Sequence, residues 1–268
     1  MGFFARLRDR VDRIDSHLCI GLDSDPQRLP DAVADADLPQ WQFNRRIIDA
    51  TASFAAAYKP NMAFYETPEG LAALTETIGY AQAQDVPVVL DAKRGDIGNT
   101  ARAYAGLLDA ADAITVNPYM GTDSVAPFLS RTDKGVYVLC RTSNSGAADL
   151  QDRTLADGQP LYAAVAALAE GWATADNVGL VVGATAPDEL AVVREIAPER
   201  PLLLPGVGAQ GGDLRAVIEG GFASGAELIN SSRGIIFADP TGGDQFAEAA
   251  RGAARRLRDA IRRLQAET

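Results

Sequence analysis

The chain alternates short apolar segments, typical of buried strands, with alanine-rich helical patterns along almost its whole length. The first strand-like segment is followed by Gly21-Leu22-Asp23 and not by a Gly-x-Gly-x-x-Gly motif. Eight β/α units in sequence predict an α/β fold of the (β/α)8 TIM-barrel type, whereas a doubly wound open sheet more often stops at about five or six strands. The predicted strands are residues 19–23, 57–62, 86–91, 113–117, 136–141, 178–183, 202–206 and 227–230.

The length of 268 residues suits one barrel domain, and no low-complexity linker or break in composition divides the chain. We therefore predict a single domain spanning residues 1–268. Residues 1–18 are predicted to form a leading helix packed outside the barrel, and residues 244–265 a closing helix. The other predicted helices are residues 41–56, 68–84, 99–110, 123–130, 160–174, 187–197 and 212–220.

The charge balance limits the class of partner and the compartment. The net charge of −11 argues against a nucleic-acid ligand, which requires a basic face. The sequence has no apolar run of about 18 residues, and its N-terminus is charged from Arg6 onward, so we predict no membrane span, no signal peptide and a cytoplasmic protein. Lysine occurs only at positions 59, 93 and 134. Either adaptation to high salt or a GC-rich genome would explain this acidic, lysine-poor composition, and composition does not separate the two.

The cysteines and the single histidine do not form a metal-binding pattern. Cys19 and Cys140 each lie in an apolar run, which favours buried thiols over a disulfide or a metal site. His17 precedes the first predicted strand and has no neighbouring histidine or cysteine motif. The sequence therefore predicts no metal and gives little support to a zinc site or a Ser-His-Asp triad.

The most informative charged motif is Asp91-Ala-Lys93-Arg94-Gly95-Asp96, at the end of the third predicted strand. Side chains alternate along a strand, so Asp91 and Lys93 are predicted to point to the same side, with Asp96 beyond the turn. A lysine between carboxylates keeps its positive charge, because opposite charges nearby favour the ionised form. Such a lysine is suited to donate a proton. Taken alone, this motif is more often a solvated salt-bridge cluster on a loop.

The other strand ends add residues that would face the same pocket, because active sites of such barrels form at the C-terminal ends of the strands. Asp23 follows the first predicted strand and Lys59 lies in the second. A glycine-rich segment, residues 205–212, follows the seventh strand, and residues 230–234 follow the eighth. Backbone N–H groups of glycine-rich turns bind anions, and Arg233 can bind phosphate through two hydrogen bonds. The two segments together predict a phosphate site.

These motifs resemble those of orotidine 5′-phosphate decarboxylase over nearly the whole predicted barrel. The Thr142-Ser143-Asn144 stretch and the long segment after it are similar to the longer subgroup of that family. The remaining motifs that carry the resemblance are Asp91-x-Lys93-x-x-Asp96-Ile97-x-x-Thr100, Pro205-Gly-Val-Gly-Ala-Gln210, Ser-Ser-Arg233-Gly and Lys59.

The resemblance implies decarboxylation of orotidine 5′-phosphate to uridine 5′-phosphate (UMP) and CO2, the last step of de novo UMP synthesis, without metal or organic cofactor. It implies that Lys93 protonates the carbanion at C6, that Asp91 lies beside the departing carboxylate, and that Lys59 orients Asp91 and the ribose. It also implies a homodimer. Further implied contacts are Asp96, Ile97 and Thr100 reaching the neighbouring subunit's site, Asp23 with ribose hydroxyls, Ser143 with the pyrimidine, and Pro205, Gln210 and Arg233 at the phosphate.

Two alternative functions remain open at this stage, and one long loop has an expected role. A sister barrel acting on sugar phosphates would need a divalent metal, which the cation of Lys59 opposes. A catalytically silent nucleotide-binding barrel is the second alternative, because fold likeness does not establish turnover. The polar segment 142–159 is long for a loop inside a compact domain, so we expect it to act as a lid.

Overall fold

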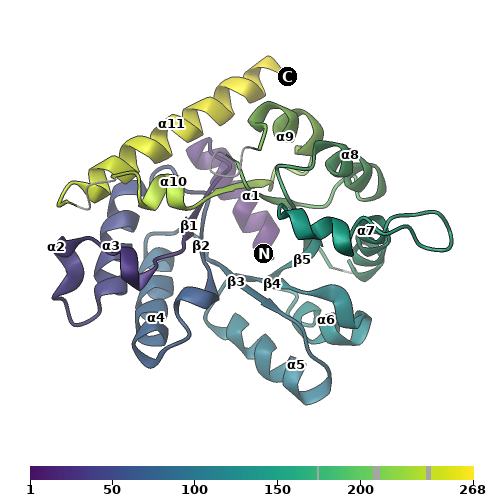
Figure 1. Ribbon diagram of the computed structural model, residues 1–268, viewed down its shortest axis with the longest axis horizontal. Coiled ribbons are helices and arrows are strands. Elements are labelled where there is room, and N and C mark those ends of the chain that lie inside the picture. The colour runs from purple at the N-terminus through teal and green to yellow at the C-terminus, as the bar shows by residue number, and fades with distance from the viewer. Residues whose placement is uncertain (174, 208–211, 240–242) are drawn as a thin grey trace.

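The computed structural model describes residues 1–173, 175–207, 212–239 and 243–268. In these ranges, eight parallel strands form one sheet in the order β2-β1-β8-β7-β6-β5-β4-β3. The bridges Tyr58–Val88 and Asn61–Asp91 join β2 to β3 and nearly close the sheet into a barrel (Figure 1). The predicted fold class is confirmed. The strands are β1 (Leu18–Leu22), β2 (Ala57–Pro60), β3 (Val89–Arg94), β4 (Ala113–Val116), β5 (Gly135–Arg141), β6 (Val178–Val182), β7 (Leu202–Pro205) and β8 (Leu228–Ser231).

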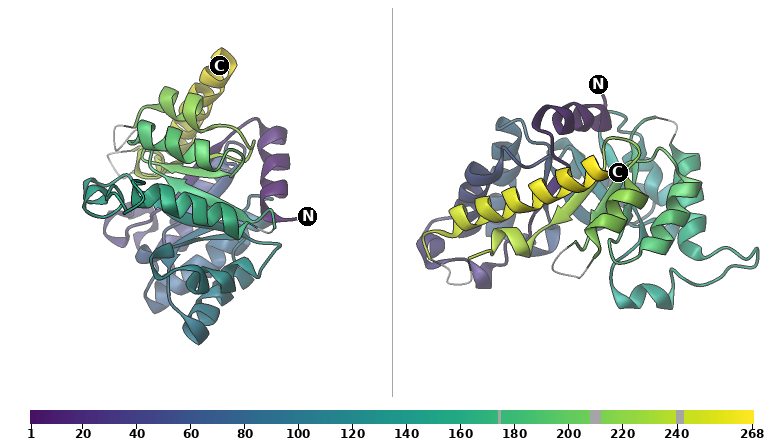
Figure 2. Two further views of the ribbon diagram at one scale, coloured as in Figure 1. Left: turned by 90° about the vertical axis from the view of Figure 1, so that its right-hand side faces the viewer. Right: turned by 90° about the horizontal axis from the view of Figure 1, so that it is seen from above.

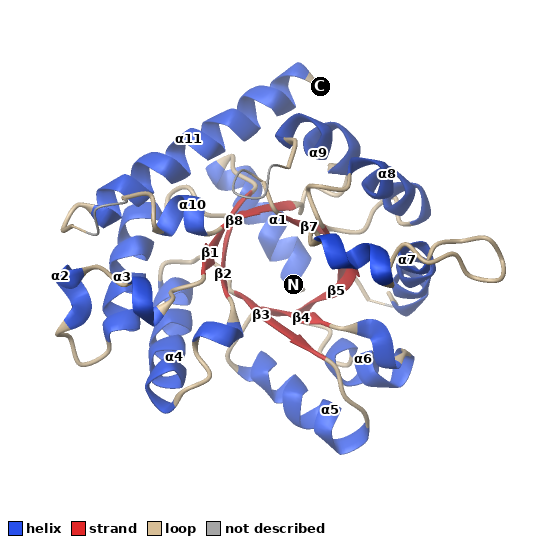
Figure 3. Ribbon diagram, in the orientation of Figure 1, coloured by secondary structure: helices blue, strands red, loops and turns tan. Residues whose placement is uncertain are grey.

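Helices surround the strands on the outside of the barrel (Figure 3). The α-helices are α1 (Phe3–Ile14), α2 (Asp31–Ala34), α3 (Pro39–Thr51), α4 (Pro68–Ala83), α5 (Gly98–Ala105), α6 (Thr122–Leu129), α7 (Leu161–Trp172), α8 (Pro187–Ile196), α9 (Leu214–Gly221), α10 (Arg233–Ile236) and α11 (Phe246–Glu267). Short 3-10 helices are η1 (Pro26–Arg28), η2 (Met62–Phe64), η3 (Gly106–Asp109), η4 (Pro118–Met120) and η5 (Ser145–Asp149).

Local sequence explains why these elements form where they do. The strands β1 and β6 are buried at every residue, as expected for parallel strands covered on both faces. Proline occupies the first turn of α3, α4 and α8, where its missing N–H leaves no bond unmade. The side chain of Thr67 caps α4 by accepting a hydrogen bond from Gly70 N at 3.0 Å. In the described part of the chain, no helix has the length and apolarity needed to cross a membrane.

The leading helix α1 lies across the N-terminal end of the barrel (Figure 2). Its side chains Phe3, Phe4, Leu7 and Val11 share one apolar cluster with an inward-facing residue from each of the eight strands. The guanidinium of the buried Arg10 donates to three backbone carbonyls, those of residues 52, 55 and 85, at 2.8, 3.0 and 2.6 Å. The interior of the barrel is therefore closed at the end opposite the predicted site.

The strand β3 differs most from its predicted bounds, because it ends at Arg94 instead of Asp91. Its pairing with β4 shifts register between Leu90 and Arg94, and Lys93 has a left-handed backbone with φ of 48°. A residue other than glycine in this conformation costs about 1–2 kcal/mol, so local interactions must hold it. The first four residues of the charged motif thus lie on an irregular strand end, and Gly95 and Asp96 follow it.

Candidate active site

A cavity of about 390 Å³ opens at the C-terminal ends of the strands, and residues on or directly after each strand line it. Its charged lining residues are the cations Lys59, Lys93 and Arg233 and the carboxylates Asp23 and Asp91. Three cations against two anions give this cavity one net positive charge, although the whole chain carries −11. A concave site of positive sign attracts anionic ligands from solution.

The centre of the cavity is an ion cluster around Asp91. The carboxylate accepts from Lys59 Nζ at 2.7 Å through Oδ2 and from Lys93 Nζ at 2.6 Å through Oδ1. Burial alone would raise the pKa of Asp91, but the two ammonium groups outweigh it and hold that pKa well below its usual range. Burial would likewise lower the pKa of Lys59, but Asp91 and, next, Asp23 raise it above its usual value. Asp91 and Lys59 are therefore both charged at neutral pH.

Thr115 on β4 holds this cluster in place, and the sequence interpretation did not select it. Its Oγ1 donates to Asp91 Oδ1 at 2.9 Å and accepts from Lys93 N at 2.9 Å. The second bond helps to fix the left-handed backbone of Lys93. A signal was present in the sequence, since Thr115 is the one polar residue in the otherwise apolar strand Ala113–Val116.

Two buried oxygens that face the cavity have no hydrogen-bond partner among the described residues, Asp23 Oδ1 and Asn230 Oδ1. An acceptor buried without a donor costs about 1–3 kcal/mol, so both atoms are favourable places for donor groups of a ligand. Asp23 was predicted to bind ribose hydroxyls, and a hydroxyl is such a donor. Asn230 was quoted only as part of the loop after β8.

The opposite wall of the cavity contains the described parts of the two predicted phosphate loops. Pro205, Gly206 and Arg233 line it, and Gly206 has a left-handed backbone with φ of 103°. The loop after β8 reaches this wall because Gly21 has no side chain: a Cβ there would lie 2.6 Å from Ser232 Cβ. Gln210, the other predicted phosphate ligand, lies outside the described residues.

The segment after β5 contributes Thr142, Ser143 and Asn144 to the cavity. Beyond them the chain forms η5 and then an excursion that projects outward beside α7, away from the strand ends (Figure 1, Figure 2). Of the predicted lid 142–159, only those first residues line the cavity.

The structure does not bring Asp96, Ile97 and Thr100 to the cavity of their own chain. Asp96 Oδ1 accepts from Ile97 N at 2.8 Å, and neither of these residues nor Thr100 is among those that line the cavity. The Ile97 side chain is 50% exposed, and Thr100 at the start of α5 is also exposed. In their own chain, these three residues are therefore not part of the cavity wall around the ion cluster.

The remaining sequence predictions concern thiols and metal ligands. Cys19 and Cys140 are free and buried, as predicted, and burial raises the pKa of each thiol to about 12. His17 is buried against Phe222, with Nδ1 at 2.8 Å from the carbonyl oxygen of Glu227. Within the ranges that the structure describes, no group of three or more histidine, cysteine, aspartate or glutamate side chains could hold a metal ion.

Comparison with known families places this cavity in context. Residues 16–244, which include all eight strands, match the family described as "Orotidine 5'-phosphate decarboxylase / HUMPS family". The chain belongs to this family. The match includes every predicted site residue and the segment that follows β5.

Similar proteins agree over most of the chain. A protein of Halorubrum lacusprofundi named orotidine 5'-phosphate decarboxylase is 64% identical over 244 residues, covering 89% of this chain and 88% of that one. One of the same name from Haloarcula marismortui is 59% identical over 273 residues, covering 97% and 99%. The solved structure of Leishmania donovani OMP decarboxylase has a TM-score of 0.84 and 43% identity, and the match covers 99% of each chain.

Proposed function

We propose that this enzyme decarboxylates orotidine 5′-phosphate to UMP and CO2 in the cytoplasm, without a metal or organic cofactor. The observation that carries the proposal is the Lys59–Asp91–Lys93 cluster at the centre of a cavity with an arginine on its opposite wall. Full-length relatives named orotidine 5'-phosphate decarboxylase support the choice of substrate.

The arrangement suits a proton transfer to carbon. Heterolytic cleavage of the bond between C6 and the carboxylate releases CO2 and leaves the electron pair on C6. The ammonium of Lys93 gives its proton to that pair, and the resulting amine regains a proton from water. Asp91 lies beside the departing carboxylate, and Lys59 keeps Asp91 oriented through its 2.7 Å ion pair and reaches the ribose.

Binding energy from the phosphate must supplement the electrostatic effect of one lysine. A unit charge pair about 4 Å apart is worth roughly 4 kcal/mol at an effective dielectric constant of 20. The most demanding enzymatic reactions require about 20 kcal/mol of barrier reduction. Arg233, Pro205 and Gln210 are proposed to bind the phosphate, Asp23 the ribose and Ser143 the base, so that this remote binding fixes C6 next to Lys93.

The sugar-phosphate alternative fits the cavity less well. An enediolate chemistry requires a divalent metal held by carboxylates at neighbouring strand ends. The end of β2 instead presents the ammonium of Lys59, which is buried and already paired with Asp91. A cation at this position would repel a metal ion.

We further propose that the enzyme is a homodimer in which Asp96, Ile97 and Thr100 enter the neighbouring subunit's cavity. These residues do not line their own cavity, and the exposed apolar side chains of Ile97 and Tyr119 lie on the segments that directly follow the adjacent strands β3 and β4. The two segments are in contact, since a Cβ on Gly95 would lie 2.9 Å from Asn117 O. Exposed apolar groups gathered in this way are typical of protein interfaces.

The activity is tested by following the ultraviolet absorbance of orotidine 5′-phosphate with purified enzyme, with and without EDTA. Loss of the orotate chromophore in both samples is expected. Lys93→Ala is expected to retain UMP binding and to lose about 10³-fold or more in kcat. Lys134→Ala is the matched control, because Lys134 Nζ donates to Ala111 O at 2.9 Å and does not line the cavity. A loss of only severalfold in the kcat of Lys93→Ala would show that Lys93 is not the proton donor.

The shared site is tested by mixing two inactive variants. Lys93→Ala and Asp96→Ala subunits should regain part of the activity after exchange, because one site of the hybrid dimer has both an intact Lys93 and an intact Asp96. Absence of recovery despite demonstrated subunit exchange would show that Asp96 acts within its own chain.

A further inference from the structure

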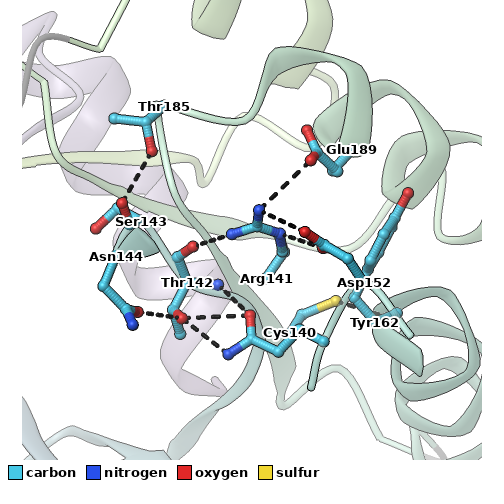
Figure 4. Close-up of polar contacts among 10 residues, drawn as sticks. Cys140, Arg141, Thr142, Ser143, Asn144, Asp152, Tyr162, Thr185 and Glu189 are labelled. Carbon is cyan, nitrogen blue, oxygen red and sulfur yellow. Dashed lines mark hydrogen bonds and ion pairs between the residues drawn. The ribbon is translucent and has the colours of Figure 1, made fainter. Parts of the chain in front are cut away.

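We propose that Gln151 is a positioning residue: its carboxamide fixes the Thr142-Ser143-Asn144 segment as a wall of the cavity. The proposal rests on the function proposed above, because it concerns the same cavity. Its direct evidence is a set of hydrogen bonds that replaces strand pairing where β5 ends (Figure 4).

The segment needs this support because it has left the sheet. The last regular contact of β5 is the bond from Gly183 N to Arg141 O, at 2.7 Å. One residue later, the backbone of Thr142 has no strand partner, and side chains take over both of its polar groups. Thr142 N donates to Gln151 Oε1 at 2.8 Å, and Thr142 O accepts from Arg141 Nη1. Buried or half-buried backbone groups require such partners, and here one comes from the loop and the other from the last residue of β5.

The same carboxamide also sets the side chains of the segment. Gln151 Nε2 donates to Thr142 Oγ1 at 2.8 Å, and Thr142 Oγ1 donates to Asn144 Oδ1 at 2.7 Å. The hydroxyl therefore acts as acceptor and donor at once, and its shorter donated bond is the one to Asn144, since Gln151 Oε1 lies 3.2 Å away. Through this chain of bonds, Gln151 orients Asn144 although the two side chains have no direct bond in the structure.

Gln151 can act as a support because its own backbone is anchored. Its N–H donates to Ala147 O at 2.7 Å, and its carbonyl accepts from Tyr162 N, the second residue of α7, at 3.0 Å. The carboxylate of the next residue, Asp152, accepts hydrogen bonds from both Nε and Nη2 of Arg141, at 2.8 and 3.1 Å. A two-point arginine–carboxylate pair fixes orientation as well as distance. The base of the excursion is thus tied to both β5 and α7.

The opposite side of the segment is closely packed, so a shift would be transmitted into the cavity. Ser143 O accepts from Thr185 Oγ1 at 3.2 Å. A Cβ on Gly183 would lie only 2.7–2.8 Å from backbone and side-chain atoms of Ser143. The segment is held between the loop after β6 and the amide of Gln151, and it lines the cavity.

The test compares Gln151→Ala with Gln159→Ala. Gln159 is an exposed glutamine in the same excursion, and its backbone, not its side chain, makes the bonds recorded for it in the structure. Hydrogen exchange at the Thr142 amide is expected to accelerate about tenfold or more in Gln151→Ala and to stay unchanged in Gln159→Ala. Two neutral hydrogen bonds are lost, so kcat/KM for orotidine 5′-phosphate should fall by about 10- to 100-fold, with part of the loss in kcat.

Gln151→Glu should restore part of the lost activity, because its carboxylate still accepts a hydrogen bond from the Thr142 amide. Its kcat/KM should lie between those of wild type and Gln151→Ala. Faster exchange with unchanged kcat/KM would overturn the positioning role. Unchanged exchange in a folded Gln151→Ala protein would overturn the support itself. The exchange measurement does not depend on turnover, so an inactive wild-type enzyme would refute the proposed function and leave this result interpretable.

Discussion

Removing Asp91 should destabilise the enzyme more than removing both Asp91 and its buried partner. Lys59 is 5% exposed, and Asp91 is the only group that accepts a hydrogen bond from its ammonium among the described residues. In Asp91→Ala this ammonium stays buried without an ion-pair partner, since Asp23 acts on it only at longer range. Lys93 loses the same partner, but it is 47% exposed, so water can solvate it.

The magnitude follows from this difference in burial. Stranding one member of a buried ion pair costs about 3–5 kcal/mol, which for a chain of this size lowers Tm by about 6–20 °C. Lys59→Met should cost less, about 1–3 kcal/mol, because Asp91 keeps Lys93 and Thr115 as partners. The double variant Lys59→Met/Asp91→Ala leaves no buried charge unpaired and should be more stable than Asp91→Ala alone.

The assay is urea unfolding followed by circular dichroism at pH 7, with the four proteins of the cycle measured in the same buffer. Activity is not used, because all three variants alter the proposed catalytic cluster. If the double variant were destabilised by the sum of the two single effects, the reasoning would fail, because the stranded charge of Lys59 would not be the origin of the loss.

Two further predictions concern packing and pH. Gly183→Ala should lower the unfolding free energy by about 1–3 kcal/mol, because the added methyl overlaps the backbone after β5. Gly79→Ala, on an open face of α4, should instead raise the unfolding free energy by about 0.5–1 kcal/mol. Burial lowers the pKa of His17 from 6.5, so the unfolded chain binds more protons as pH falls below about 6.5, and stability should decrease there. His17→Asn should flatten this decrease in urea unfolding measured from pH 7.5 to 5.5, and an unchanged slope would assign it to other groups.

The barrel could be predicted from sequence because burial on both faces makes each strand a short apolar run. All eight strands were found, with ends displaced by a few residues. The largest displacement is in β3, where Lys93 takes a left-handed backbone. Hydrophobic periodicity does not report such a conformation, since it depends on the hydroxyl of Thr115 from the neighbouring strand.

The sequence predicted those site residues that lie at the C-terminal ends of strands, because these ends converge in a barrel. Asp23, Lys59, Asp91 and Lys93 do line one cavity, and the pairing of Asp91 with Lys93 is as expected. The role of Gln151 was not visible, because it depends on how the chain returns to α7 after a polar excursion. The sequence pattern does not predict the path of the chain from this excursion back to α7. In the structure, hydrogen bonds to the first turn of α7 fix that path.

The position of α1 also constrains the order in which the chain can complete its fold. These twelve residues are synthesised before every strand of the barrel, yet their apolar face packs in a cluster that includes Leu228 of the last strand. On the ribosome, α1 therefore lacks its full set of contacts until β8 has emerged. A helix that is made before the barrel strands is thus among the last elements to reach its final environment, and the barrel end stays open to solvent or to chaperones until then.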